Sequence, residues 1–551
     1  MNRVSVIIEG EKLFVLPGTP LNEILAVHDM QGDPTDPVVL GVINGQWSPL
    51  SDPLWGDEQV GLLRLSHPKT HSTSVQTLAT VLAIACDELH PDKELLVDFS
   101  LGEGMYCTLG DNVTEDDLAS IEQRMGGIID QDREIMPRIF GQRTLVRKLR
   151  GSRFSYTRRA ARYVDPGSTP LSQVEGCDLI FQGLQLPSTR HVRAFALTLE
   201  APGFLLLPSS RGRPDDVVAP VERPRLLEAM RNWASWADAS EMADLGGLNR
   251  GIAQGRGKEL VRLCEARHGR QIIEISDRIV ALPDDGRLVL IAGPSSSGKT
   301  STAKRLTLQL KVLGFKPQTL SLDDYFVNRD ATPKDEHGRL DYESIEALKL
   351  DLFNDHLAAL LAGESVSPPT YDFSTGLGGW RNEEVRLPRG TPLIVEGLHA
   401  LNPRLAANVD HGNVLRLYVS ALCHTNVDNV TYLPTTMTRI IRRIVRDAQF
   451  RGYSASETLS RWPQVRAGED RWIFPHQENA DLIFNSGLAY EMSVLKLWAE
   501  PHLAAVGPED PSYGRARTLL KWLRAHLPLD AGLVPPTSLL REFVGGSGFS
   551  Y

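Results

Sequence analysis

The chain has 551 residues, which fits about three or four domains of roughly 150 residues each. Hydrophobic residues make up 42% and charged residues 23%, the balance of a globular protein, which excludes a mostly disordered chain. The 59 Lys and Arg against 69 Asp and Glu give a net charge of −10, so general binding to nucleic acid or membranes is disfavoured and any anion site must be local.

Cysteine usage and apolar runs indicate the compartment. The five cysteines are scattered and none forms a CxxC pair, which argues against a disulfide framework or a zinc ribbon and fits a reducing cytoplasm. The mostly apolar run Val4–Ile8 is too short for the core of a signal peptide, and no segment reaches the ~20 residues that span a bilayer. We therefore expect a cytoplasmic protein without a membrane partner.

Residues 1–65 have the pattern of a small β-rich unit. Thr19 is the expected N-cap of a short helix that starts at Pro20 and runs to about His28. The dipeptide Asn44-Gly45 predicts a hairpin turn. The predicted strands are Val4–Ile8, Leu13–Leu16, Val38–Ile43 and Gly61–Leu65.

Residues 66–284 alternate helices, strands and a loop. The apolar spacing predicts helices at Val75–Leu89, Glu115–Arg124, Leu226–Ala243 and Gly255–Glu274. The last two helices form the expected connector. The segments Leu95–Ser100 and Met105–Leu109 predict paired strands, and residues 211–224, rich in Pro and charge, predict a surface loop.

From about residue 285, strands alternate with helices, which predicts a parallel sheet with helices on both faces. The strand Arg287–Ala292 leads through a loop rich in Gly and Ser into a long helix from Lys299. Later predicted strands are Thr319–Leu322, Leu393–Val395 and Val414–Val419.

The loop before Lys299 carries the strongest chemical signal. Its sequence, Gly293-Pro294-Ser295-Ser296-Ser297-Gly298-Lys299-Thr300, matches GxxxxGK[ST] between a strand and a helix. Glycines let backbone N–H groups close around phosphates, Lys299 supplies a cation, and the Thr300 hydroxyl can ligate Mg²⁺. The expected nucleotide-binding residues are Gly293, Ser295, Ser296, Ser297, Gly298, Lys299, Thr300 and Ser301.

Two predicted strands of this region lead into carboxylates, which would face a ligand at the carboxyl edge of a parallel sheet. Asp323, in the segment Ser321–Phe326, is the candidate for orienting an acceptor hydroxyl and taking its proton. Glu396 is the candidate for holding Mg²⁺ directly or through water. A solvated loop acid for Asp323, and a capping or surface Glu for Glu396, stay open as alternatives.

The segment Thr438–Arg451 contains five arginines. Four of them fall at i, i+3, i+4 and i+7 and share one helix face, and arginine binds phosphate oxygens through paired N–H groups. We interpret this face as a phosphate clamp, with a solvated basic face as the open alternative. The arginines that share the face are Arg439, Arg442, Arg443 and Arg446.

The motifs continue in seven segments in one order: GPSSSGKTST, SLDDYF, RLDYES, PPTYDF, IVEGLHAL, TRIIRRIVRD and ENADLIFNS. Through them residues 285–490 resemble the uridine kinase/phosphoribulokinase family of P-loop kinases. The resemblance implies a kinase that uses ATP and Mg²⁺ to phosphorylate a small-molecule acceptor, a nucleoside at its 5′-hydroxyl.

The resemblance also implies roles by position. Asp323 matches the catalytic base, with Lys299 as a second catalytic residue. The lid over the phosphates corresponds to Arg439, Arg443 and Arg446. The substrate contacts implied are Asp341 near the sugar hydroxyls, Tyr371 near the base, and Phe326.

One departure concerns the acceptor. Uridine–cytidine kinases carry a His a few residues after the YDF segment, and Ser374–Gly379 contains none. A kinase of a non-nucleoside sugar or sugar phosphate therefore stays open as an alternative. The family often forms oligomers, so a homo-oligomer also stays open.

The front half has further resemblances. Residues 1–65 are similar to a TGS domain, a ubiquitin-like β-grasp module, through LPGTPLNEIL and GVINGQWSPL. Residues 67–210 resemble the second domain of threonyl-tRNA synthetases and related editing domains, through HSTSVQTLA, GEGMYCTL and the segment Asp178–Thr189.

The hydrolytic pocket of that editing family is degenerate in this chain. The family uses an HxxxH pair and a later Cys/His pair, and the matching positions are His71, Val75, Phe181 and Gln185. One His cannot make a tetrahedral metal site, so we interpret His71 as structural or hydrogen-bonding and disfavour active editing.

The expected fold is therefore multidomain α/β and α+β. It comprises an N-terminal β-grasp domain (1–65), an α+β synthetase-like middle domain (66–240), a helical connector (241–284) and a C-terminal P-loop kinase domain with a parallel sheet (285–551). The basic run Arg147–Arg162, with Phe154 and Tyr156 inside it, keeps an RNA-associated regulatory ATPase open as a different class of function. RNA is not favoured as a partner, because the chain is acidic and a solvated basic face explains the run.

Overall fold

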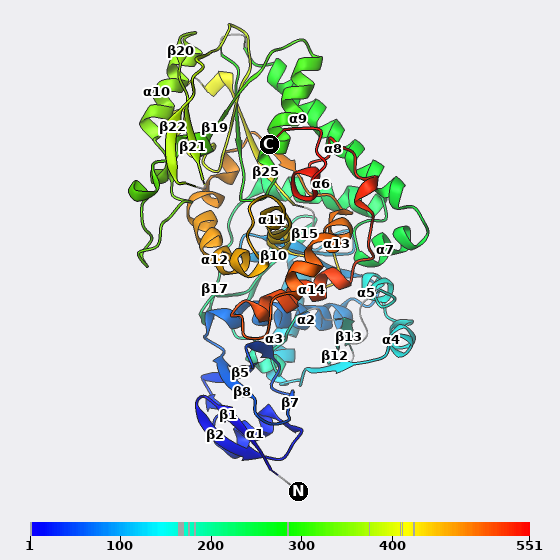
Figure 1. Ribbon diagram of the computed structural model, residues 1–551. Coiled ribbons are helices and arrows are strands. Elements are labelled where there is room, and N and C mark those ends of the chain that lie inside the picture. The colour runs from blue at the N-terminus through cyan, green and yellow to red at the C-terminus, as the bar shows by residue number, and fades with distance from the viewer. Residues whose placement is uncertain are drawn as a thin grey trace.

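The computed structural model describes residues 3–163, 170–174, 177–180, 183–283, 286–373, 375–407, 409, 411–422 and 425–550. Figure 1 shows an N-terminal part (residues 3–65) at one end of the molecule, a middle part (66–223) beside it, and a C-terminal part (224–550) that forms the rest. The domain boundaries given above stay predictions.

The N-terminal part is a mixed sheet with one helix against it. Its elements are β1 (Val4–Ile8), β2 (Glu11–Val15), β3 (Thr19–Pro20), α1 (Leu21–Val27), β4 (Gly32–Asp33), β5 (Asp36–Ile43), β6 (Gln46–Ser48), β7 (Pro53–Leu54) and β8 (Gln59–Arg64). The strands lie in the order β2-β1-β8-β5-β4, with β1 antiparallel to β2 and parallel to β8. Val6 and Ile8 of β1 are buried against Ile24 and Leu25 of α1, while Ile7 points away.

The turn chemistry of this part is confirmed at one position and wrong at another. Asn44-Gly45 joins β5 to β6, with φ angles of 48° and 78°. Thr19 does not cap the helix, because pairing with β7 holds it extended in β3 and its hydroxyl donates to the Leu16 carbonyl at 2.8 Å. The helix α1 starts after Pro20.

Within the described residues, the middle part combines helices with sheets of four, three and two strands. Its elements are α2 (His71–Leu89), β9 (Leu95–Leu101), β10 (Gly104–Leu109), α3 (Glu115–Asp130), β11 (Met136–Ile139), α4 (Gln142–Leu149), α5 (Ser155–Ala160), β12 (Pro170–Val174), β13 (Cys177–Ile180), β14 (Ala196–Glu200), β15 (Gly203–Leu207), β16 (Ser209–Ser210) and β17 (Arg213–Val217). The larger sheet has the order β14-β15-β10-β9, and α2 and α3 bury their apolar side chains against it. The paired strands β9 and β10 confirm the prediction, whereas the loop predicted over residues 211–224 is wrong in part because β17 pairs with β16.

The C-terminal part contains a parallel sheet with helices on both faces. Its helices are α6 (Pro224–Ala239), α7 (Leu245–Ala253), α8 (Gly257–Val280), α9 (Lys299–Val312), α10 (Leu350–Leu361), α11 (Thr435–Phe450), α12 (Ala455–Trp472), α13 (Glu491–Ala504), α14 (Tyr513–Arg524) and α15 (Arg541–Val544). Its strands are β18 (Leu288–Ala292), β19 (Gln318–Ser321), β20 (Ser365–Val366), β21 (Pro369–Asp372), β22 (Leu377–Trp380), β23 (Val385–Arg386), β24 (Leu393–Glu396), β25 (Val414–Ser420) and β26 (Leu482–Asn485). The sheet order is β19-β24-β18-β25-β26, and every neighbouring pair is parallel, as predicted.

Strand β18 shows how both faces of this sheet are covered. Leu288 and Leu290 face one apolar cluster, which includes side chains of α10. Val289 and Ile291 face the opposite cluster, which includes side chains of α8, α9, α11 and α13. Because side chains alternate along a strand, a continuous apolar strand needs a helical layer on each side. The second cluster also includes Trp233 of α6, so the predicted connector shares its core with this sheet.

The segment between β25 and α11 reaches into the middle part. Val430 belongs to the apolar core of the middle part. The main-chain oxygen of Asn429 accepts from the Val97 N–H at 2.8 Å, and its amide oxygen accepts from the N–H groups of Tyr156 and Thr157 at 3.1 and 3.2 Å. Its amide nitrogen donates to the Leu95 carbonyl at 3.1 Å. One buried side chain therefore joins the two parts.

Two further findings concern apolar helices and thiols. Among the described helices, none is long and apolar enough to cross a membrane. Cys86, Cys107 and Cys264 are buried free thiols. Burial raises the pKa of the Cys86 and Cys264 thiols to about 12, so both are protonated at neutral pH.

We predict that Asn429→Ala lowers the free energy of unfolding by about 2 to 4 kcal/mol, because buried backbone groups lose their hydrogen-bond partners. Urea unfolding followed by tryptophan fluorescence measures the change. The exposed Asn382→Ala is the matched control, with a shift below about 0.5 kcal/mol expected. Equal shifts for the two variants would contradict the role of Asn429.

Candidate active site

The phosphate loop, residues 293–300, lies at the carboxyl edge of the parallel sheet between β18 and α9. A Cβ at Gly293 would overlap the Val419 carbonyl oxygen of β25, so only glycine fits there. Ser296 and Gly298 have φ angles of 59° and 89°, a left-handed geometry that lets successive N–H groups converge on an anion. The hydroxyls of Ser296 and Ser297 are buried without a hydrogen-bond partner among the described residues, which leaves two donors at the loop.

Glu396 stands at the end of β24 beside the phosphate loop. Strands β19 and β24 run in register, with Ser321 opposite Glu396. The Ser321 and Thr300 hydroxyls both donate to Glu396 Oε1, at 3.0 and 3.4 Å. Burial and, after it, the negative charge of Asp323 raise the pKa of Glu396 to about 7, although the positive charge of Lys299 opposes the rise. Three oxygen-bearing side chains therefore meet next to Lys299.

Asp323 lies in the 3₁₀ turn Leu322–Tyr325, directly after β19. Its N–H donates to the Ser321 hydroxyl at 3.3 Å, which fixes the turn. Asp323 is an exposed residue, but the many protein atoms around its carboxyl group desolvate it and so raise its pKa, and the positive charges of Lys299 and Arg451 oppose that rise. An accessible carboxylate with a raised pKa is suited to receive a proton from a hydroxyl.

The predicted substrate residues Phe326 and Tyr371 lie together in an aromatic cluster. The Phe326 and Tyr371 ring centroids are 5.5 Å apart, and Phe373 packs edge-on against Tyr371 at 4.9 Å. Arg381, next to β22, donates to Asp324 at 2.6 Å and so ties the β21–β22 hairpin to the turn that holds Asp323.

The predicted Asp341 lies in the same electrostatic neighbourhood. Its Oδ1 accepts from the Glu343 N–H at 3.1 Å. Burial raises the pKa of Glu343 to about 7, with Asp341 adding to the rise and Lys299 opposing it. Glu343 therefore belongs to this site, although the sequence analysis did not select it. The position of Glu343 in the sequence does not distinguish it from an ordinary surface Glu. Only the structure shows that its side chain lies against Gly468.

The arginines of α11 divide into two groups. Arg439 and Arg442 are buried and form bidentate ion pairs with Glu469 and Glu491. Arg442 also donates to carbonyls of the phosphate loop. These two side chains hold the loop from behind, so a phosphate contact by Arg439 stays only a prediction.

The second group of arginines surrounds one carboxylate. Arg443, Arg446 and Arg451 all lie within 3.6 Å of the Asp447 carboxylate, which leaves surplus positive charge. Arg443 also donates to the Ser295 hydroxyl of the phosphate loop at 2.8 Å. Burial lowers the pKa of Arg451 to about 10, still high enough to keep its charge. A phosphate contact by Arg443 and Arg446 stays a prediction.

Two more acidic residues, one at the phosphate loop and one at the first turn of α9, were not selected from the sequence. Glu469 of α12 accepts from the Ser295 N–H at 3.0 Å while it pairs with Arg439. Glu542 of α15 accepts from the Ser301 hydroxyl. Both are far along the chain from the loop, so only the tertiary fold reveals them.

Comparison with known proteins agrees with this geometry. Residues 288–493 match the sequence model of the Phosphoribulokinase / Uridine kinase family. A uridine kinase of Bacillus pumilus is 33% identical over 213 residues, which are 38% of this chain and 91% of that protein. The chain belongs to the phosphoribulokinase/uridine kinase family.

Other uridine kinases match this family member in the same region. That of Chloroflexus aggregans is 29% identical over 38% of this chain and 94% of its own length. That of Macrococcus caseolyticus is 30% identical over 36% and 88%. The chain is therefore a kinase-family phosphotransferase in its C-terminal part. The similarity of the front half to TGS and synthetase domains stays a prediction.

In the front half of this kinase-family chain, the structure describes three of the four residues singled out from the sequence. His71 is partly buried, and burial lowers its pKa. The Gln185 amide donates to the Thr80 hydroxyl at 2.7 Å, and Phe181 lies outside the described residues. Within the described residues, no cluster of three or more His, Cys, Asp or Glu could hold a metal ion.

The basic run considered for RNA has its aromatic residues inside the protein. Phe154 and Tyr156 are 7% and 9% exposed, so neither ring is available to stack on a base. Arg159 pairs with Asp244 at 2.7 Å, and Arg153 pairs with Asp87 at 2.7 Å. Through these ion pairs, arginines of the run connect it to the rest of the protein.

We predict that Glu469→Gln lowers the free energy of unfolding of this kinase by about 3 to 5 kcal/mol, because it leaves the Arg439 charge buried and unpaired. Chemical denaturation measures the change. Asp470→Asn is the matched control, since Asp470 is exposed and pairs with Arg466 at the surface. A Glu469→Gln protein as stable as the control would rule out the buried pair as the anchor of the loop.

Proposed function

We propose that the chain transfers the γ-phosphoryl group of ATP to the 5′-hydroxyl of a nucleoside. The observation that carries this proposal is the position of Asp323. Its carboxylate is accessible, has a raised pKa, and lies where Lys299 and the arginines of α11 act on it. A kinase needs a proton acceptor at the phosphates, and this is the arrangement that such a step requires.

The phosphate loop and α11 would hold the nucleotide. The loop amides, the unpaired hydroxyls of Ser296 and Ser297 and the ammonium of Lys299 offer donors to phosphate oxygens. Arg443 and Arg446 bring surplus positive charge to the same place. Fixed donors of this kind stabilise the charge that shifts between oxygens during transfer.

The side chains at the sheet edge fit Mg²⁺. Thr300 and Glu396 meet at 3.4 Å, and hydroxyl and carboxylate oxygens are the ligands that Mg²⁺ prefers. Thr300 and Glu396 would hold the ion, which when bound neutralises phosphate charge.

Asp323 would then orient the acceptor hydroxyl and receive its proton as the phosphoryl group is transferred. The aromatic cluster of Phe326 and Tyr371 offers flat apolar surfaces for a base, and Asp341 offers acceptors for sugar hydroxyls. Support for a nucleoside comes from the uridine kinases that the chain matches over about nine-tenths of their length.

We predict that Asp323→Asn reduces the turnover number by about 10²- to 10⁴-fold while leaving ATP affinity within about threefold, because only proton transfer is lost. ADP release is measured with uridine, cytidine, adenosine, ribulose 5-phosphate and no acceptor. Asp330→Asn, an exposed acid of the same region, is the matched control and keeps full activity.

Two outcomes of this experiment would contradict the proposal. Turnover that does not depend on any acceptor would point to an ATPase, and turnover with ribulose 5-phosphate alone would point to a sugar-phosphate kinase. Unchanged turnover in Asp323→Asn would remove Asp323 from the reaction.

We also predict a pH-dependent Mg²⁺ requirement. The pKa of Glu396 is about 7, so at pH 6 most of this carboxyl is protonated and at pH 8 most is ionised. Because only the ionised form binds a cation well, the Mg²⁺ concentration for half-maximal ADP release falls by about tenfold from pH 6 to pH 8. The exposed Glu384→Gln keeps this profile. A requirement that is the same at both pH values would exclude Glu396 as a ligand.

A further inference from the structure

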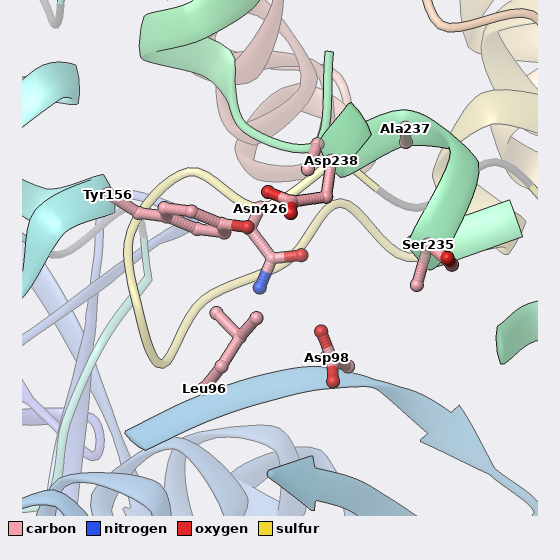
Figure 2. Close-up of a pocket in the computed structure, with 9 residues that line it drawn as sticks. Leu96, Asp98, Tyr156, Ser235, Ala237, Asp238 and Asn426 are labelled. Atoms are coloured by element: carbon pink, nitrogen blue, oxygen red, sulfur yellow. The ribbon is translucent and has the colours of Figure 1, made fainter. Parts of the chain in front are cut away.

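A cavity lies between the middle and C-terminal parts, away from the phosphate loop (Figure 2). Its volume is about 260 Å³. Its walls come from strand β9, from α5, from the end of α6 and from the segment after β25. The lining residues used below are Leu96, Asp98, Tyr156, Ala237, Asp238 and Asn426.

The cavity presents two carboxylates on opposite walls. Figure 2 shows Asp98 rising from β9 and Asp238 coming from the end of α6. Asp98 is only 7% exposed, and its one hydrogen bond among the described residues is from the Thr108 hydroxyl at 3.3 Å. Within the same residues, neither Asp98 nor Asp238 has a cation within ion-pair distance.

Neutral acceptors complete the polar lining. The Asn426 amide nitrogen donates to the Val97 carbonyl at 2.8 Å, and Figure 2 shows its oxygen directed to the cavity side. The phenol oxygen of Tyr156 also points toward the cavity. The nearby guanidinium of Arg159 stacks on the Tyr156 ring and pairs with Asp244, so it is already engaged. The cavity therefore has acceptors in excess of donors.

The chemistry of the walls selects an organic cation over a metal ion. The described residues contain no group of three or more metal-ligating side chains, and the volume is far larger than a bare ion needs. Leu96 and Ala237 add apolar surface that suits methylene groups. A buried carboxylate without an ion-pair partner, such as that of Asp98, is costly, and an ammonium group would satisfy it with charge-assisted hydrogen bonds.

We propose that this cavity binds a small aliphatic amine, whose ammonium group is held by Asp98 and Asp238, with Asn426 and Tyr156 as further acceptors. Burial raises the pKa of Asp98 to about 7, and the negative charge of Asp238 adds to the rise. The two carboxylates thus lack a balancing positive charge, which the ammonium group of an amine would supply.

Isothermal titration calorimetry on the full chain tests the proposal without ATP, so its outcome is independent of kinase activity. The probe is 1,4-diaminobutane, and its neutral counterpart butane-1,4-diol is the ligand control. We expect saturable binding of the diamine and none of the diol. Asp98→Asn and Asp238→Asn each weaken diamine binding by about tenfold or more, the loss expected for one charged hydrogen bond.

Asp215→Asn, an exposed acid outside the cavity, is the matched protein control and binds like the wild type. Asp238 is also exposed, so its variant keeps the fold and tests the site even where Asp98→Asn alters stability. Three results would overturn the proposal: no saturable heat with the diamine, equal binding of diamine and diol, or unchanged diamine binding in Asp238→Asn. Displacement of the diamine by millimolar Mg²⁺ at constant ionic strength would assign the cavity to a metal ion instead.

Discussion

The phosphate loop keeps its shape because buried guanidinium groups hold it from behind. Arg439 pairs with Glu469 and donates to the Ser295 carbonyl, and Glu469 accepts from the Ser295 N–H. Arg442 pairs with Glu491 and reaches the next two carbonyls of the loop. Charges taken out of water need complete partners, so these buried ion pairs connect the loop with α11, α12 and α13. This arrangement fixes the positions of the side chains around Lys299.

The front half of the molecule is attached at the segment that directly precedes α11. The segment that precedes α11 places Val430 in the core of the middle part and Asn429 between β9 and α5. The middle part is therefore attached to the C-terminal part through the residues that precede α11, and not only through the chain that connects the two parts.

The parallel sheet and the phosphate loop could be predicted because both depend on local sequence patterns. The acids at the strand ends could be predicted because parallel strands end at the same edge of a sheet. Asp323 and Glu396 lie where that rule puts them. The division of the arginines could not be predicted, because helical spacing shows that they share a face but not that Glu469 and Glu491 neutralise two of them. The role of Thr19 was missed because its pairing with the distant strand β7 overrides the local cap signal. Strand β17 was missed because its charged and Pro-rich sequence is typical of a loop, although it pairs with the neighbouring β16.

Figure 1 shows the C-terminus beside α9, and there the last segment of the chain packs on the phosphate loop. A Cβ at Gly298 would overlap Leu539, and Glu542 accepts from Ser301, which lies 241 residues earlier. At about 5 to 20 residues per second, a ribosome needs roughly 10 to 50 s to make the intervening chain. During that time the nascent protein exposes an incomplete nucleotide site with one apolar side uncovered. The nucleotide site is thus complete only after residues 539–542 have been synthesised.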